Sequence, residues 1–169
     1  AQTVSISKAA LYLYFENKID LFLSMVERKL SQLVEALETA MSGCDNEINA
    51  IKRAIEVELE FFNENMEFFL VFQRQRGEIQ LHAKLSDDEI KDRVLPFINS
   101  KVGIISKYIK QGQKNGTFQT VNPTEAAFML TALIHTCVFM RVMSQQDNNL
   151  LGKADIIGKI FLNGLLVRE

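Results

Sequence analysis

The chain has 169 residues, of which 47% are hydrophobic and 24% charged, and its formal net charge is −2. This length and composition suit one domain of ordinary size or two small ones, and they exclude a disordered chain. The slightly acidic balance argues against a protein that coats nucleic acid along its whole length, although a few lysines suffice for a small local contact.

The first predicted element is a short helix that begins after Ser7, within the run ISKAALYLYFENKIDLF at residues 6–22. In this helix Leu11 and Phe15 lie together and can face a core. Lysines at both ends of an aromatic helix suit duplex DNA, because ammonium groups bind phosphates and rings reach base edges. The residues alone leave an alternative open, in which the aromatic side chains only cover the base of the next helix.

Longer amphipathic helices are predicted to follow. Apolar residues at three- and four-residue steps predict a helix from Asn17, its N-cap, to Gly43. A second helix is predicted over about 46–63 and a third over about 66–76. Strand-like alternation is absent from the sequence, so the predicted fold class is all-α.

The fourth long helix has clear boundary signals. Ser86 and Glu89 form a predicted capping box at its start. The helix should bend or break near Pro96, which cannot donate to the hydrogen-bond ladder. We expect it to resume to about residue 114 and to stop at Gly116.

The last two predicted helices are the most apolar. The NPTE motif at residues 122–125 caps a helix that runs to about residue 143, and a final helix covers about 153–167. Residues 126–140 carry no formal charge, but this segment is shorter than the roughly 20 residues that span a bilayer. We therefore expect a buried helix and no membrane contact. Its cover is either a second copy of the chain or the rest of a monomer.

The sequence predicts no signal peptide, no disulfide and no metal or cofactor site. The opening residues AQTVSISKAA contain no apolar signal-peptide segment, which favours a cytoplasmic protein. Cys44 and Cys137 lie far apart, so we expect reduced, buried thiols. His82 and His135 are the only histidines in the sequence, and neither a metal site nor a cofactor is predicted.

The run at residues 6–22 resembles part of the helix-turn-helix domain in the TetR family of transcriptional repressors. The family pattern is Val/Ile-Ser-x-x-x-Leu-Tyr-x-(Tyr/His)-Phe-x-(Ser/Asn)-Lys-x-x-Leu, and it is matched here by Ile6, Ser7, Leu11, Tyr12, Tyr14, Phe15, Asn17, Lys18 and Leu21. The resemblance implies a recognition helix over about 7–14 that enters the major groove. It implies phosphate contacts by Ser7, Tyr12 and Lys18, and positions nearest the bases for Lys8, Ala9, Leu13 and Tyr14.

In that family two more helices precede the recognition helix, whereas this sequence has only AQTVS before Ile6. The rest of the DNA-binding domain is therefore expected upstream, either disordered or removed by truncation. Residues 1–22 are then the C-terminal part of a helix-turn-helix domain, and residues 23–169 an effector-binding and dimerisation domain. The resemblance also implies a homodimer through the last two helices, with Phe128 and Phe161 as candidate contacts.

A ligand site is predicted in the central helices, where the run FFNENMEFFLVF covers residues 61–72. Such bulky side chains either fill a core or line a pocket for an apolar effector. Arg76 after this run either pairs with a carboxylate or is solvated, and His135 is either a core histidine or an effector contact. The candidate effector-binding residues are Phe62, Met66, Phe69, Phe72, Arg76, Phe97, Tyr108, Met129 and Leu133.

The sequence therefore favours a DNA-binding transcriptional regulator, a repressor that a small hydrophobic effector releases from double-stranded operator DNA. An enzyme is not expected, because the sequence has no Gly-rich phosphate loop, nucleophile elbow or HExxH motif. Helix capping accounts for the carboxylates at residues 87–89. The alternative function is a helical, dimeric ligand-binding or protein-interaction module without DNA binding.

Overall fold

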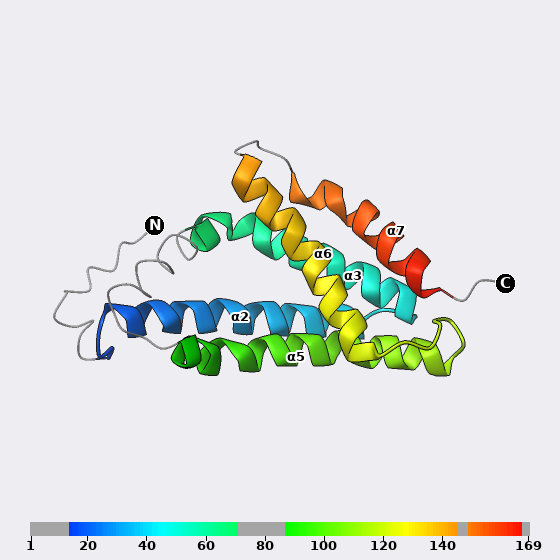
Figure 1. Cartoon of the computed structure of the whole chain (residues 1–169), viewed down its shortest axis with the longest axis horizontal. Helices are drawn as coiled ribbons and strands as arrows, with labels where there is room; N and C mark the ends of the chain where they lie inside the picture. Colours follow the sequence, from blue (N-terminus) through cyan, green and yellow to red (C-terminus); the bar gives the residue numbers. More distant parts are fainter. Residues whose placement is uncertain (1–13, 71–86, 145–148, 167–169) are drawn as a thin grey trace.

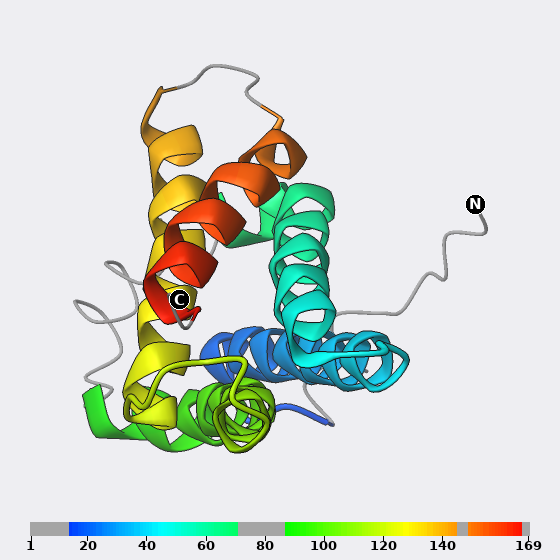
Figure 2. The same cartoon turned by 90° about the vertical axis from the view of Figure 1, so that its right-hand side faces the viewer.

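The computed structural model describes residues 14–70, 87–144 and 149–166. Within these ranges the chain is helical, apart from turns and one isolated β-bridge between Phe118 and Leu166, which confirms the all-α fold class. Figures 1 and 2 show two helices side by side, with three more packed against one side of this pair. The pair is α2 (Lys18–Ser42) and α5 (Asp87–Lys114), and the others are α3 (Glu47–Glu64), α6 (Pro123–Ser144) and α7 (Ala154–Leu165).

Side-chain caps fix where the first two described helices begin. The backbone N–H of Asp20 donates to Asn17 Oδ1 at 2.9 Å, so α2 begins at the predicted cap. The N–H of Asn49 donates in the same way to Asn46 Oδ1 at 2.9 Å, at the start of α3. The predictions for these two helices are confirmed.

The predicted boundaries between α5 and α6 are confirmed as well. Gly116 follows α5 with a φ of 73°, a left-handed conformation that glycine adopts without steric cost. Asn122 Oδ1 accepts the N–H groups of Thr124 and Glu125 at 3.0 and 3.3 Å. Pro123 occupies the first position of α6, where its missing N–H costs no hydrogen bond.

The prediction at Pro96 was a bend or a break, and the break is wrong because α5 continues through this residue. A proline inside a helix removes one backbone hydrogen bond, and contacts on either side compensate here. Arg93 ties the preceding turn to α2 through ion pairs, and Ile98 packs against the hydrophobic core.

Two other predicted elements are described only in part. Residues 66–70 are helical, and the rest of the helix predicted over 66–76 lies outside the described residues, as does Ser86. A short 3-10 helix, η1 (Leu150–Lys153), precedes α7, so the last α-helix begins one residue later than expected.

The hydrophobic core lies between the helix pair and the three helices packed on it. Its members are spaced at helical intervals on every helix, which is why one continuous core forms. Cys44 and Cys137 are free and half-buried, which is less burial than expected. The largest fully buried apolar side chains are Leu37, Met41, Ile51, Ile55, Leu59, Ile105, Ile109, Leu130, Ile134 and Leu150.

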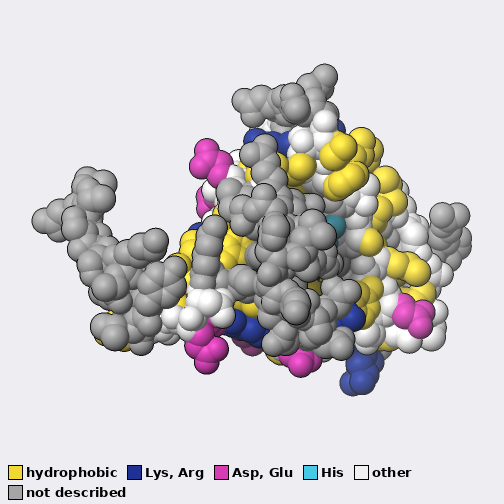
Figure 3. All heavy atoms as spheres, turned by 60° about the vertical axis from the view of Figure 1, so that its left-hand side comes forward, with side chains coloured by type: hydrophobic (Ala, Val, Ile, Leu, Met, Phe, Trp, Pro, Cys, Tyr) yellow, Lys and Arg dark blue, Asp and Glu magenta, His cyan; other side chains and the backbone are white. Residues whose placement is uncertain are grey.

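Helix α6 has the predicted bounds, but it is less buried than expected. It has 22 residues, and its segment Pro123–Met143 is long and apolar enough to cross a membrane, a test that core helices of soluble proteins also pass. Only 33% of that segment is buried within the chain. Figure 3 shows hydrophobic side chains gathered on the surface at the height of α6 and α7. The exposed large apolar side chains of α6 are Phe128, Met129, Phe139, Met140 and Met143.

Gly112 on α5 provides a test of the packing at the end of the core. A Cβ atom at this position would overlap the ring of buried Phe118, whereas a Cβ at exposed Gly103 on the same helix meets nothing within 4 Å. We expect Gly112→Ala to lower the free energy of unfolding by about 1–3 kcal/mol. Gly103→Ala should raise it by up to about 1 kcal/mol, because alanine favours a helix interior.

Urea denaturation of the two variants and the unchanged chain measures both effects. Equal shifts for the two alanine variants would contradict the close packing of Gly112 against Phe118.

Candidate functional site

A cavity of about 620 Å³ lies between α2, α5 and α6. Its wall is mostly apolar, with Lys91, Lys101 and His135 as the polar exceptions. Concave, largely apolar sites with a few polar groups are typical of small-molecule binding. The apolar lining residues are Val26, Leu30, Leu33, Val34, Phe62, Phe69, Val94, Leu95, Phe97, Ile98, Val138, Phe139 and Val142.

The structure brings three of the candidate effector residues together in this cavity, Phe62, Phe69 and Phe97. The rings of Phe62 and Phe69 lie 4.6 Å apart, centroid to centroid. Met66 and Tyr108 instead pack against the core away from the cavity. Phe72 and Arg76 lie outside the described residues.

Met129 and Leu133 line a second hollow, between α6 and α7. Residues 129, 132, 133 and 136 form one stripe of α6, and residues 135, 138, 139 and 142 form another that faces the cavity. Because successive helical residues are rotated by about 100°, the two stripes are neighbours on the surface of one helix. Sequence periodicity could not assign them, since α6 is apolar nearly all round.

A buried ion pair stands at the edge of the cavity. Lys101 Nζ donates to Glu58 Oε2 at 2.8 Å, and the two side chains are 6% and 0% exposed. Burial raises the pKa of the Glu58 carboxyl, and the charge of Lys101 opposes that rise. The second oxygen, Glu58 Oε1, is buried without a hydrogen-bond partner. Such a pair costs desolvation energy, so its presence in a core is not explained by stability.

His135 forms part of the cavity wall. Its ring meets the edge of Phe62 at a centroid distance of 5.4 Å and borders the open cavity. The residue is exposed on the cavity side, and desolvation by the neighbouring protein atoms lowers its pKa to about 4, helped by the charge of Lys101. The imidazole is therefore neutral at pH 7 and can both donate and accept a hydrogen bond.

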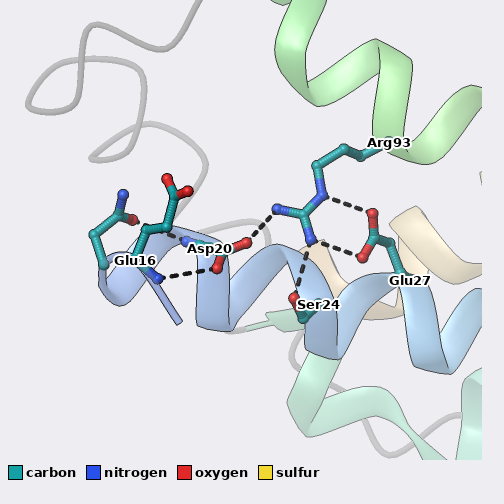
Figure 4. A network of polar contacts seen from close by, with 6 residues as sticks. Glu16, Asp20, Ser24, Glu27 and Arg93 are labelled. Carbon is teal, nitrogen blue, oxygen red and sulfur yellow. Dashed lines mark hydrogen bonds and ion pairs between the residues drawn. The ribbon is translucent and has the colours of Figure 1, made fainter. Parts of the chain in front are cut away.

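A second polar network joins the first turns of α2 to α5 beside the cavity (Figure 4). The Arg93 guanidinium donates to both Glu27 carboxylate oxygens at 2.6 and 2.7 Å, to Asp20 Oδ1 at 2.8 Å and to Ser24 Oγ at 3.0 Å. Asp20 Oδ2 also accepts the backbone N–H of Glu16 at 3.2 Å. Bidentate arginine–carboxylate pairs fix geometry as well as adding energy. The network therefore connects a cavity-lining helix to the residues immediately before α2.

Most of the candidate DNA-binding residues lie outside the described part of the chain, namely Ser7, Lys8, Ala9, Tyr12 and Leu13. Tyr14 is described, and its side chain is 83% exposed. Lys18 is the first residue of α2, but its side chain is not among those described. The domain boundary expected between residues 22 and 23 falls inside α2, so a single helix links the two proposed domains.

Glu58, Lys101 and Arg93 were not predicted as functional residues. Glu58 follows Ile51 and Ile55 at helical spacing, and Lys101 follows Ile98, so each charge occupies a position in an apolar stripe. That pattern was a usable signal for two buried charges. Arg93 gave no such signal, because its partners are more than sixty residues away in the chain. Within the described ranges, no three metal-binding side chains gather.

A protein-family model identifies the chain. The TetR C-terminal family described as "YsiA-like protein, C-terminal region" matches residues 26–164. The chain belongs to the TetR family of transcriptional regulators. The matched residues form the ligand-binding C-terminal domain of such a regulator. No curated protein matches the chain.

Solved structures of TetR-family regulators share this fold. FadR from Bacillus subtilis, in complex with stearoyl-CoA, is 18% identical with a TM-score of 0.78, over 94% of this chain and 82% of FadR. FadR from Bacillus halodurans is 18% identical with a TM-score of 0.79, over 96% and 81% of the two chains. PfmR from Thermus thermophilus is 20% identical with a TM-score of 0.72, over 94% and 82%. These relatives are transcriptional regulators, not enzymes, and at such identities they show the fold alone.

The Glu58–Lys101 pair predicts a pH-dependent loss of stability. Lys101→Met leaves the Glu58 carboxylate buried without a counter-charge, which should cost about 3–5 kcal/mol in free energy of unfolding near pH 7. A carboxyl whose pKa is raised in the folded state binds its proton more tightly there than in the unfolded chain. The loss is therefore small in acid and grows as the pH rises through the folded-state pKa.

Urea unfolding at about pH 5 and about pH 8, relative to the unchanged chain, checks this sign. The double variant Glu58→Leu/Lys101→Met is the control, and it should recover most of the lost stability because no unpaired charge remains. A loss of equal size at both pH values would show that Glu58 is not the group responsible.

The Arg93 network should protect the backbone amides in the first turns of α2 from hydrogen exchange. Arg93→Lys keeps the charge but loses the bidentate geometry, so the amides of residues 18–24 should exchange hydrogen faster. Arg53→Lys is the matched control, because Arg53 pairs with Glu56 and Glu60 of its own helix. Hydrogen exchange followed by mass spectrometry measures both variants, and unchanged exchange in Arg93→Lys would contradict a connecting role.

Proposed function

We propose that this TetR-family protein is a cytoplasmic repressor, which binds operator DNA as a homodimer and leaves it when a small hydrophobic effector fills the cavity. The observation that carries the proposal is that the two helices that line the cavity, α2 and α5, are also joined next to the residues that precede α2. These helices supply the cavity wall, and Arg93 ties α5 to the first turns of α2. The residues before α2 are those that carry the recognition-helix pattern.

The proposed effector is largely apolar, because the cavity wall is. FadR of Bacillus subtilis was solved in complex with stearoyl-CoA, whose acyl chain is a ligand of this chemical kind. That similarity of fold supports the size and apolar character of the proposed ligand.

Effector binding would act on DNA affinity through the position of α5. A ligand changes an equilibrium only if it binds one conformation better than the other. Filling the cavity favours the conformation in which α5 stands further from α2 and α6, and Arg93 carries that displacement to Asp20 and Glu27. The N-terminal turns of α2 then reorient, and the two recognition helices no longer match their half-site spacing.

The proposed dimer is formed by α6 and α7. Phe128 and Met129 on α6 are 46% and 63% exposed, and Ile156 and Ile160 on α7 are 53% and 58% exposed. An exposed apolar surface of this kind marks an interaction site, and a twofold contact with a second copy is the commonest arrangement. Phe161, the other residue expected at this contact, is 8% exposed and belongs to the core of its own chain.

DNA binding is tested by salt dependence, in a chain that carries the complete helix-turn-helix. Lys18→Ala removes a proposed phosphate contact, so it should weaken operator and random DNA alike. The slope of log affinity against log salt should fall by roughly one per bound subunit. Leu13→Ala and Tyr14→Ala should instead reduce the ratio of operator to random affinity, because base contacts carry discrimination.

Lys114→Ala, at the last residue of α5, is the control and should leave both affinities unchanged. Fluorescence anisotropy at several salt concentrations measures all four variants. Wild-type affinities in every variant would contradict the recognition-helix assignment. No DNA binding by the complete protein would favour the alternative of a ligand-binding or protein-interaction module.

The dimer is tested by placing charge on its proposed surface. Phe128→Asp and Ile160→Asp put a carboxylate where apolar side chains would be buried, so each variant should be monomeric by light scattering. Met25→Asp is the control, because Met25 is 48% exposed on α2, away from this surface, and the variant should remain dimeric. A monomer in the unchanged chain would exclude this arrangement.

A further inference from the structure

The cavity has one polar corner, formed by Glu58, Lys101 and His135. Lys101 and His135 line the cavity, and Glu58 lies behind Lys101, fully buried on α3. The only other charged residue among the described lining is Lys91, which is exposed. The rest of the described wall is apolar, so Lys101 is the buried polar residue with which a ligand in the cavity can form a hydrogen bond.

Lys101 has unused capacity to donate hydrogen bonds. An ammonium group carries three N–H donors, and in the described structure one of them meets an acceptor, Glu58 Oε2. The whole residue is 5% exposed and lines the cavity, so a molecule in the cavity can reach the other two. Buried donors without acceptors are costly, and each such group in a native structure calls for an explanation. A ligand acceptor in the cavity would provide one.

The charges of the polar corner decide what kind of acceptor fits. Glu58 and Lys101 together are neutral, and the lowered pKa of His135 keeps its imidazole uncharged at pH 7. A ligand carboxylate would add a second negative charge beside Glu58 in a buried site, which disfavours it. A neutral carbonyl accepts a hydrogen bond from Lys101 and leaves the ion pair intact. Neutral His135 can also donate a hydrogen bond to this carbonyl without adding charge to the site.

We propose that the polar corner recognises a neutral carbonyl group of an otherwise apolar ligand, such as a ketone, ester, thioester or amide, through a hydrogen bond from Lys101. This proposal rests on the cavity being the effector site. It adds the chemical class of the ligand and the residue that selects it. The Glu58 carboxylate acts as a positioning group, because it holds the Lys101 ammonium at the cavity edge.

The test compares three small probes by calorimetric titration of the unchanged chain. Butyrophenone has a phenyl ring, a short alkyl chain and a ketone, and butylbenzene lacks only the carbonyl oxygen. The third probe, 4-phenylbutyrate, carries a carboxylate. We expect butyrophenone to bind most tightly, about tenfold more tightly than butylbenzene, as a hydrogen bond from a charged donor allows.

The double variant Glu58→Leu/Lys101→Met removes the donor together with its counter-charge. In this variant butylbenzene should bind more tightly than butyrophenone, because the ketone then leaves water without gaining a partner. Lys110→Met is the matched control, since it removes an exposed cation of the same helix outside the cavity lining, and it should keep the preference for butyrophenone. The comparison of probes on the unchanged chain stands even if the double variant does not fold.

Three results would overturn the proposal in different ways. Equal affinity for butyrophenone and butylbenzene in the unchanged chain would leave the cavity as a binding site but remove carbonyl recognition. Tighter binding of 4-phenylbutyrate would assign the polar corner to an acid. If none of the three probes binds, the cavity is not the effector site and the proposed function fails with it.

Discussion

Helix α5 is held by charge at two places, and the cavity lies beside both of them. Arg93 binds the carboxylates of Asp20 and Glu27 on α2, and two turns further along Lys101 binds Glu58 on α3. The side chains between these points are mostly apolar and face the cavity. Apolar contacts alone would allow α5 to slide, because they have no direction. The two ion pairs give the helix a defined register against both neighbours, and the shape of the cavity depends on that register.

Much of the fold could be predicted from the sequence because helix ends are local. Asn17, Asn46 and Asn122 cap their helices with their own side chains, and Gly116 ends α5 through its own backbone conformation. Pro96 shows the limit of local argument. A local rule predicts a bend or a break there, whereas the ion pairs that hold the preceding turn are made with a different helix.

The site was less predictable than the fold, since it depends on which helix faces meet. Phenylalanines at 62, 69 and 97 line the cavity, whereas Met129 lies on a neighbouring stripe of α6 and misses it. A uniformly apolar helix carries no periodic signal from which its faces could be assigned. Charged residues within apolar stripes are more informative, because burying a charge requires a partner. Membership of the TetR family predicts the architecture, whereas the polar corner depends on the individual residues of this chain.

The two stripes of α6 have a mechanical consequence. His135 lies in the stripe that faces the cavity, and Met129 in the stripe that borders the hollow toward α7. Because both belong to one rigid helix, any axial rotation that makes room for a ligand turns the second stripe by the same angle. In a dimer built on that second stripe, a ligand in one subunit changes the surface presented to the other. Occupancy of the two cavities is then thermodynamically linked, and the linkage is reciprocal.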